Sequence, residues 1–572
     1  MDEKERRENQ NLKENPLKTS NEEINLETTS KHMTKAIFFN FLMSYGSIPI
    51  NLILTMIISR IISEDAWGQL IYATVIATAP QIILNFIPPS SQQIIIYQFP
   101  EMLINKKKAR IKGILNYFFK VKITLSLGIT LFYAIFSIIL WYRTKDLFYI
   151  LLLFVSPQIL YIATNAIFRD FYIAHKQYNF QPQFFFIGKL ITLSFYIILA
   201  LIPLNADVKL SILAIVVTLE WFYAIPFYYY HYRKDYRNIE PEKVSWQDIK
   251  SLTKFGLYYS VSNASWLLYK QFYTAFLNIY GIPSYNTYDH ICNNISSKAY
   301  SGISVSNAPV LSDLESTHQR EKMLRLFKIT INFVTFLVCI IIGLLHFLSE
   351  LYITIIYPSE YRIIIPIVEI YIFSAFFITL QANYKELISV TKNQRSFMAI
   401  SLIENAIFTV LAFFGMYFFS FEGIIYSRLI GWASAVVLFW FFGRYIIKEF
   451  KLSILLLFKN FIALIVIVLI LVPVIFPYFE YVILDFLNAE IIIQWASGVL
   501  NNLFDFDTIY VIEIGVEFIL QAFLFLMFFL AYLIMFRVIT KEDISRFENL
   551  GFKIPLKNFL FRILKKILRH EK

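Results

Sequence analysis

Two lysines stand inside long apolar stretches of this sequence, where an unpaired charge is costly. Lys270 falls within the stretch 255–280, and Lys298 falls within 288–310. If these stretches cross a bilayer as helices, the rise of 1.5 Å per residue puts both lysines near its middle or outer half. Ionisable groups at that depth usually face a wet cavity or one another. The first interpretation is therefore that both lysines face a lumen and meet an anion.

The second interpretation is structural pairing, in which each lysine is neutralised by a carboxylate. The carboxylates that also fall within apolar stretches are Glu220, Glu369 and Glu404. Arg428, a few residues inside the outer end of the stretch 424–446, we interpret as a snorkelling anchor rather than a ligand. Arg60 directly follows the first stretch, 34–59, where it either faces the lumen or snorkels. The polar groups that could face a polar ligand are Asn40, Asn51, Gln81 and Asn85.

The composition predicts the helices that must position these residues. Of 572 residues, 57% are hydrophobic and 16% are charged, against about 25% charged in a typical soluble domain. A membrane-spanning helix needs about 20 mostly apolar residues, and we identify about fourteen such stretches. They are 34–59, 68–99, 121–140, 147–168, 184–203, 210–230, 255–280, 288–310, 325–348, 363–384, 397–419, 424–446, 455–479 and 510–536. The fold class is thus an all-α integral membrane protein.

The second stretch, 68–99, is overlong and contains Pro80, Pro88 and Pro89. We expect a kinked helix or one with a re-entrant end, because proline breaks helices. Between the first two stretches, Glu64 and Asp65 should begin a helix, where carboxylates are favourable. The two cysteines, Cys292 and Cys339, lie in apolar runs and are expected to be small core residues.

The distribution of charge predicts the orientation. Most of the 52 Lys and Arg residues flank one set of loops, and the outer loops hold few. Those few are Arg60, Arg143, Lys145, Lys209 and Arg362. By the positive-inside rule, both termini are cytoplasmic in a multi-pass protein of the cytoplasmic membrane. The net charge of +11 then lies beside lipid, so the expected partners are anionic membrane lipids rather than nucleic acid.

The domain organisation follows from the polar breaks. Residues 1–33 are a polar, charge-mixed tail that we expect to be disordered, and they contain no signal peptide. The polar linker 231–254 divides two six-helix lobes, 34–230 and 255–446. Two additional helices within 447–538 enclose an outer loop, 480–509. The segment 539–572 is a basic cytoplasmic tail whose residues 557–570 form an interfacial amphipathic helix, with a solvated basic tail as the alternative.

Motifs for catalysis or cofactor binding are absent from the sequence. No Cys/His cluster has metal-ligand spacing, and no Gly-rich phosphate loop or nucleophile motif is present. The prediction is therefore a protein that is not an enzyme and has no cofactor and no metal. Helical transporters are commonly built from repeated bundles with the binding site between them, which agrees with the two predicted lobes.

Several short motifs carry a family resemblance. RIISEDAWGQLIY (60–72) resembles the signature that follows the first span of polysaccharide flippases, which belong to the multidrug/oligosaccharidyl-lipid/polysaccharide exporter superfamily. LTKFGLYYS (252–260), NAPVLSDLES (307–316) and ITKEDISRFENL (539–550) are similar to the family's seventh-span opening, eighth-span ending and final segment. The resemblance covers roughly residues 34–550.

The resemblance implies a transporter that flips a polyprenyl-diphosphate-linked oligosaccharide by alternating access. The first, second, seventh and eighth spans would line a central cavity, and a coupling cation would be a further partner. Lys270-Gln271 departs from the acidic or mixed-charge pair expected early in the seventh span. The alternatives are a cation-coupled multidrug or metabolite exporter of the same superfamily, and a membrane-embedded glycosyltransferase or polymerase. The loop 480–509 lacks the His, Arg and Lys residues that the enzyme would need.

Overall fold

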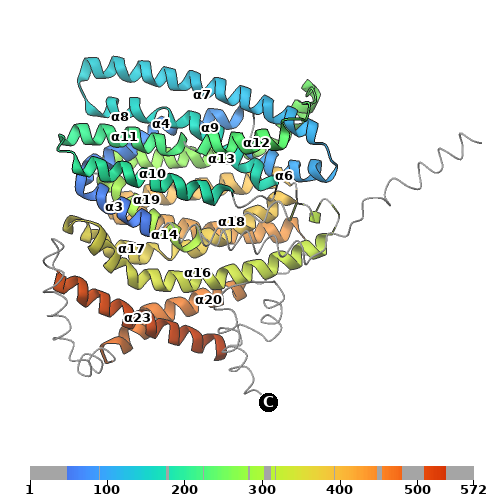
Figure 1. Ribbon diagram of the computed structural model, residues 1–572. Coiled ribbons are helices and arrows are strands. Elements are labelled where there is room, and N and C mark those ends of the chain that lie inside the picture. Colours follow the sequence, from blue (N-terminus) through green and yellow to red (C-terminus); the bar gives the residue numbers. More distant parts are fainter. Residues whose placement is uncertain are drawn as a thin grey trace, which may run out of the picture.

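The computed structural model describes residues 48–88, 91–175, 180–222, 224–280, 284–301, 319–391, 393–447, 454–478 and 508–535, with 311–312, 314–315 and 317. Throughout these residues every regular element is a helix (Figure 1). Seven of the described helices are long and apolar enough to cross a membrane, or eight if one bent pair counts as a single span. The prediction of an all-α integral membrane protein is confirmed.

Helices α3 to α12 form the part that we call the N-half. Their bounds are α3 (Ile48–Ile61), α4 (Glu64–Thr78), α5 (Gln81–Phe86), α6 (Ser91–Ile104), α7 (Lys108–Thr144), α8 (Leu147–Val155), α9 (Gln158–Ala174), α10 (Phe180–Leu201), α11 (Ala206–Phe222) and α12 (Ala224–Tyr236). The predicted stretch 68–99 falls on α4, α5 and α6. Pro80 directly precedes α5 and Pro88 follows it, so the broken second span is confirmed and its breaks lie at prolines.

Helices α13 to α19 form the C-half, and a last pair packs beside it. The bounds are α13 (Trp246–Tyr280), α14 (Ser284–Ser301), α16 (Arg320–Ile356), the 3₁₀ turn η1 (Ser359–Ile364), α17 (Ile365–Tyr371), α18 (Ser374–Val390) and α19 (Gln394–Ile446). The last pair consists of α20 (Ile454–Val466), continued by the π-helical turn η2 (Ile467–Leu471), and α23 (Thr508–Met535). Both α20 and α23 pack on α16 at the edge of the molecule opposite α7 (Figure 1).

The predicted stretches 397–419 and 424–446 both fall within α19, which reverses direction between them. Phe419 and Ser420 have non-helical dihedrals, and Ser420 has a φ of 55°. The two arms pack closely, because a Cβ added at Gly423 would lie 2.1 Å from the carbonyl oxygen of Gly415. Glycine is required at this approach, and α19 is therefore a helical hairpin rather than one long rod.

We name the two ends of the bundle by their turns. At the Ser63 end, α3 gives way to α4, and Ser63 caps α4 by accepting a hydrogen bond from the Ala66 amide at 3.3 Å. At the Asn105 end, α6 gives way to α7. Glu64 and Asp65 occupy the first turn of α4, as the sequence predicts.

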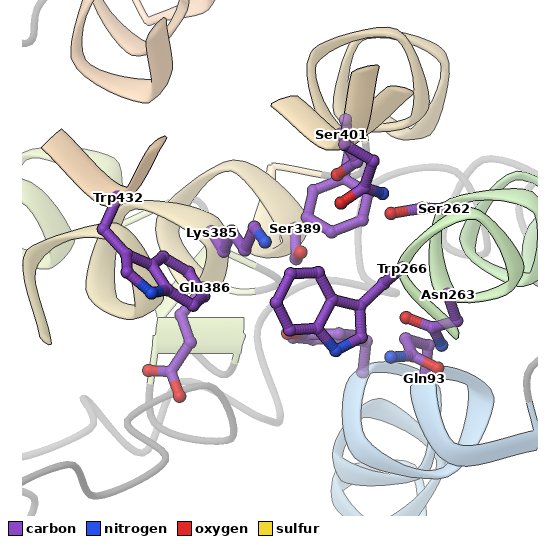
Figure 2. Close-up of a pocket in the computed structure, with 12 residues that line it drawn as sticks. Gln93, Ser262, Asn263, Trp266, Lys385, Glu386, Ser389, Ser401 and Trp432 are labelled. Atoms are coloured by element: carbon purple, nitrogen blue, oxygen red, sulfur yellow. The ribbon is translucent and has the colours of Figure 1, made fainter. Parts of the chain in front are cut away.

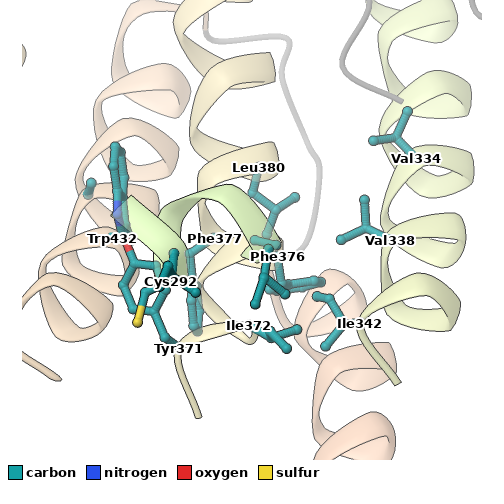
Figure 3. Close-up of a cluster of buried hydrophobic side chains, with 14 of the residues drawn as sticks. Cys292, Val334, Val338, Ile342, Tyr371, Ile372, Phe376, Phe377, Leu380 and Trp432 are labelled. Atoms are coloured by element: carbon teal, nitrogen blue, oxygen red, sulfur yellow. The ribbon is translucent and has the colours of Figure 1, made fainter. Parts of the chain in front are cut away.

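Within the predicted linker 231–254, α12 continues to Tyr236 and α13 begins at Trp246. The predicted tail 1–33, Asn40, the outer loop 480–509 and the tail 539–572 with its helix 557–570 lie outside the described residues. Both cysteines are fully buried and free, so their prediction as core residues is confirmed. Cys292 belongs to the same buried cluster as Ile342, Tyr371 and Phe376, a core shared by α14, α16, α17 and α18, and lies beside Tyr371 in Figure 3.

Candidate functional site

Helix α14 of the C-half, which packs on α4 of the N-half, is rich in polar side chains and anchors a largely buried network. Asp289 and Asn293 lie one turn apart on the same face of α14. Arg428 of α19 donates to Asp289 Oδ1 at 2.6 Å and to Asn293 Oδ1 at 3.0 Å. The Tyr273 hydroxyl of α13 donates to the same Asp289 oxygen at 2.7 Å, and the Tyr371 hydroxyl donates to Asn293 Oδ1 at 2.8 Å. This network joins α13, α14, α17 and α19.

The interpretation of Arg428 as a snorkelling anchor is therefore wrong. Its guanidinium does not extend toward the interface but lies against the rings of Tyr273 and Tyr371, 4.8 and 5.6 Å from their centroids. A buried guanidinium needs a carboxylate and further hydrogen bonds to offset the loss of solvent. Asp289 and Asn293 supply these contacts, and they set the position of Arg428.

Arg60 joins the two halves at the Ser63 end. Its guanidinium donates to the carbonyl oxygens of Ile356 at 3.1 Å and Ile355 at 3.3 Å, in the last turn of α16. Ser59 donates to the Ile356 carbonyl oxygen as well, at 3.1 Å. The last carbonyls of a helix have no partner within it, and a cation is the favoured cap there. The structure thus places Arg60 on a helix end.

Glu64 and Asp65 form the matching contacts with the beginning of α14. The Tyr288 hydroxyl donates to Glu64 Oε2 at 2.8 Å, and Thr287 Oγ1 donates to the Glu64 carbonyl oxygen at 2.9 Å. The Ser284 amide, at the start of α14, donates to Asp65 Oδ1 at 3.2 Å. We refer to these contacts and those of Arg60 as the Ser63-end clamp.

Lys270 is the predicted lumen lysine whose side chain the structure describes. It is exposed and forms no hydrogen bond or ion pair within the described part of the chain, although Asp289 and Arg428 lie within electrostatic range. At 3.6 residues per turn, it shares a face of α13 with Asn263 and Trp266. That face points away from Leu268 and Phe272, which are 46% and 61% exposed and cover the opposite, apolar side.

The residues around Lys270 show that this face looks into the space between the two halves. The adjacent Gln271 donates to the Val75 carbonyl oxygen of α4 at 3.0 Å, which fixes α13 against the N-half. On the other side, Tyr269 packs on Phe408 of α19, with ring centroids 5.4 Å apart. Lys270 projects between these contacts with the N-half and the C-half.

A cavity of about 350 Å³ lies along the same face of α13, toward the Asn105 end (Figure 2). Helices α6, α13, α18 and α19 form its walls, so both halves contribute. Its lining residues are Gln93, Tyr97, Ser262, Asn263, Trp266, Lys385, Glu386, Ser389, Phe397, Ser401, Asn405 and Trp432. In Figure 2 the Trp266 ring lies in the middle of this group, with Asn263 and, beneath it, Gln93 to the right. Lys270 stands one helical turn from Trp266, at the Ser63 side of the cavity.

An ion pair borders the cavity where α18 faces α19. Lys385 Nζ lies 2.9 Å from Glu404 Oε2 and donates to Oε1 at 3.1 Å. Gln381 also donates to Glu404, whose side chain is 1% exposed. Among the described side chains, Glu404 is thus paired with Lys385 and not with Lys270, the pairing that the structural interpretation allows.

The other predicted residues are placed as follows. Asn51 lies in α3, and Gln81 and Asn85 lie in α5, which packs on α13; Ser260 donates to the Asn85 carbonyl oxygen at 2.5 Å. Glu369 of α17 accepts a contact from the His346 ring on its backbone oxygen at 3.1 Å and is not paired with Lys270. Lys298 and Glu220 lie in α14 and α11, but their side chains are outside the described residues.

Sequence reasoning missed Asp289 and Lys385, both for the same reason. Asp289 lies at the start of the predicted stretch 288–310, and Lys385 directly follows the predicted stretch 363–384. Both residues were therefore expected at the membrane interface and not inside the bundle. The signal that could have found Asp289 is the polar run SYNTYDHICNNISSK, which is unusual for a membrane helix. Within the described residues, no group of three or more His, Cys, Asp or Glu side chains could hold a metal ion.

Comparisons with known proteins show what this fold resembles. No family model matches the sequence, and a search of curated proteins finds no match. Among solved structures, a variant of the MATE transporter VcmN of Vibrio cholerae aligns with a TM-score of 0.55 at 13% identity, over 74% of this chain and 98% of that one. A MOP-superfamily transporter from Pyrococcus furiosus, described as having a binding pocket of reverse polarity, aligns with a TM-score of 0.56 at 12% identity, over 73% and 97%.

These alignments define the class of fold. The chain is a multi-pass helical membrane protein with the fold of MATE transporters.

Proposed function

We propose that this protein flips a polyprenyl-diphosphate-linked oligosaccharide across the cytoplasmic membrane by alternating access. The observation that carries the proposal is Lys270, a cation between the two halves that pairs with no described residue and lies next to a cavity wall made mostly of neutral, hydrogen-bonding and aromatic groups. An ammonium in that position suits a diphosphate as a point contact. The fold shared with MATE transporters supports transport in general, and the lysine favours an anionic substrate.

The contacts between the two halves suggest which end of the transporter is closed in the state described. The Ser63-end clamp holds the halves together at one end, while the cavity lies toward the Asn105 end. By the positive-inside rule the Asn105 end is cytoplasmic, because Lys106, Lys107 and Lys108 follow α6 there. The state described is then closed to the outside, with Lys270 and the cavity on the side from which a lipid-linked sugar would be loaded. Opening the clamp would be the complementary half of the cycle.

A second candidate function is the export of drugs or metabolites coupled to a cation. Two observations favour it: the solved structures with this fold include a MATE transporter, and Glu386 and Glu404 place carboxylates at the cavity. Against it, Lys385 already neutralises Glu404, and Lys270 would repel a lipophilic cation.

The test is reconstitution of the purified chain in vesicles with a fluorescent lipid-linked oligosaccharide. Lys270→Ala should weaken binding of the diphosphate about ten- to hundredfold, since a charge-assisted hydrogen bond contributes about 1.5–3 kcal/mol, and flipping should fall with it. Lys270→Arg should retain more activity than Lys270→Ala. Lys254→Ala, on an exposed turn of the same helix, is the matched control and should flip at the wild-type rate.

Three results would overturn the proposal. The first is no flipping by the wild-type chain under conditions in which it exports a lipophilic cation. The second is an unchanged flipping rate in Lys270→Ala. The third is equal loss in Lys270→Ala and Lys254→Ala, which would point to charge in general rather than to this site.

A further inference from the structure

Apart from the charged residues Lys385 and Glu386, the lining of the cavity beside Lys270 combines two kinds of side chain. One kind is neutral and hydrogen-bonding, with three amides (Gln93, Asn263 and Asn405) and three hydroxyls (Ser262, Ser389 and Ser401). The other is aromatic, with Tyr97, Trp266, Phe397 and Trp432. Ligands that present hydroxyls at their rim and C–H groups on their faces match such a wall, because rings pack on apolar faces and amides pair with hydroxyls.

Several hydrogen-bonding groups in this wall have no partner among the described residues. The Asn263 amide makes no hydrogen bond within the described part of the chain, and it is accessible from the cavity. Gln93 Oε1, Ser401 Oγ and Trp432 Nε1 are buried atoms for which the described residues provide no partner. These three atoms are covered by the protein, so of the groups named here it is the Asn263 amide, which can both donate and accept, that an occupant of the cavity can reach.

The hydrogen bonds of Asn405 fix the orientation of its side-chain amide. Its Nδ2 donates to Ser265 Oγ at 2.5 Å, and Ser265 in turn donates its hydroxyl proton to the Ser262 carbonyl oxygen at 2.8 Å. Because Ser265 already donates its only hydroxyl proton to Ser262, Asn405 must act as the donor to Ser265 through its NH₂ group. Asn405 Oδ1 is then an acceptor without a partner among the described residues.

Two charged residues, Lys385 and Glu386, also line the cavity. Lys385 is held by Glu404, and Gln381 donates to the same carboxylate. The unpaired Lys270 lies one turn of α13 beyond Trp266, about 6 Å along the helix axis at 1.5 Å per residue. A ligand with an anionic group at Lys270 would thus present its adjoining neutral part to the Trp266 wall.

We infer that this cavity is a binding site for a neutral sugar, with the Trp266 ring under one face and the amides of Gln93, Asn263 and Asn405 around the rim. Its volume of about 350 Å³ is at the lower end of the range of about 300–1,000 Å³ for ligand pockets, which suits one or two sugar rings. This inference rests on the proposed function for its biological meaning, since the sugar bound here would be the one nearest the diphosphate.

The experiment measures sugar binding directly and does not depend on flipping. The full chain in lipid nanodiscs is titrated with methyl glucoside, N-acetylglucosamine and maltose by saturation-transfer NMR. Trp266→Leu should raise the dissociation constant about tenfold, from the loss of ring packing. Asn263→Leu should raise it about two- to tenfold, from the loss of one hydrogen-bonding group. Trp440→Leu, on α19 outside the cavity, should leave it unchanged.

A second measurement avoids variants that remove side chains needed for folding. Cys292 and Cys339 are fully buried, so a single cysteine introduced by Ser262→Cys reports on the cavity. Bound sugar should slow its alkylation at least threefold, whereas mannitol, which has hydroxyls but no ring, should protect it less.

The outcomes separate this inference from the proposed function. Sugar binding that is lost in Trp266→Leu, in a wild-type chain that flips no lipid-linked sugar, would support the sugar site and overturn the flippase. Flipping by a wild-type chain that binds none of the three sugars would do the reverse. Saturable binding of tetraphenylphosphonium in the cavity, with no sugar binding, would overturn the sugar site in favour of a cation site.

Discussion

Arg428 Nη1 donates to Asp289 Oδ1 at 2.6 Å, and this contact joins the second arm of the α19 hairpin to the first half of α14. The two residues are 139 positions apart. Asp289 also accepts from Tyr273, so one carboxylate holds three helices of the C-half together.

Removing one member of this pair should destabilise the protein strongly. Arg428→Met leaves Asp289 without its counter-charge, which typically costs about 3–5 kcal/mol when an ion pair is buried. Arg428→Lys should recover only part of this, because an ammonium cannot contact Asp289 and Asn293 with the same planar group. Thermal unfolding in detergent measures the effect. The double variant Arg428→Met/Asp289→Asn should be more stable than Arg428→Met alone, and equal stabilities would show that the pair is not coupled.

The Ser63-end clamp should control how often that end opens. Thr287→Val and Tyr288→Phe each remove a hydrogen bond to Glu64, at about 0.5–1.5 kcal/mol each, so together they should raise the open population roughly five- to hundredfold. Spin labels on cysteines introduced at Lys145 and Glu422 report the separation of the two halves at this end. Tyr258→Phe, which removes a hydroxyl at the Asn105 end, should leave the distance distribution unchanged. A clamp variant that matches wild type would show that these contacts do not hold the closed state.

His175 should make stability depend on pH. It lies just beyond the end of α9, where its ring contacts the Phe171 carbonyl oxygen at 2.8 Å through Nδ1 and the Tyr236 hydroxyl at 2.7 Å through Nε2. Burial lowers the pKa of His175, and the nearby Lys108 lowers it further, against the opposing effects of the Phe171 backbone and Asp235. The folded protein therefore holds the ring neutral at a pH where the unfolded chain protonates it.

The sign of the dependence follows from this pKa. Below about pH 6.5, the ordinary value for histidine, the unfolded chain binds more protons than the folded protein, so the free energy of unfolding decreases as the pH falls. The melting temperature should be constant above that pH and drop below it. His175→Gln, which cannot titrate, should show a shallower drop. The same slope in both proteins would remove His175 as the cause.

The orientation of the bundle can be tested on one helix. Lys107 and Lys145 flank α7 at its two ends and are both exposed. Cysteines introduced singly at these positions should react differently with an impermeant maleimide on intact cells: Lys145→Cys should label, and Lys107→Cys should label only after lysis. Cys292 and Cys339 are buried and should not react with the maleimide. Labelling of position 107 from outside would reverse the predicted topology.

Much of this fold is predictable from the sequence, because apolar length and proline position are local properties. Each predicted apolar stretch coincides with a described helix or part of one, and the break near Pro80 follows from the missing amide of proline. Lys270 stands out in the sequence alone, since a lysine deep in an apolar stretch is unusual wherever its neighbours lie. These features need no knowledge of which helices touch.

Which charged residues pair with one another is not a local property, and this is the part of the structure that the sequence did not predict. Whether Glu404 meets Lys270 or Lys385 depends on how α18 and α19 align, and a single sequence does not contain that register. Arg428 was misjudged for the same reason, because its partner Asp289 lies on another helix. The cavity wall also combines residues from four helices, so its aromatic and amide composition is visible only after folding.

The polarity of α14 bears on how the protein is made. Its sequence, SYNTYDHICNNISSKAYS, contains Asp289 and several amides and hydroxyls in place of a continuous apolar run. A single Asp at the centre of a helix raises the free energy of insertion by about 2.5–3.5 kcal/mol, so this segment should not leave the translocation channel for lipid on its own. Its partners on α16 and α19 are synthesised later. We therefore expect nascent α14 to wait at the channel until α16 emerges, and a ribosome-bound chain that is long enough for α14, but not α16, to have left the exit tunnel should leave α14 outside the bilayer.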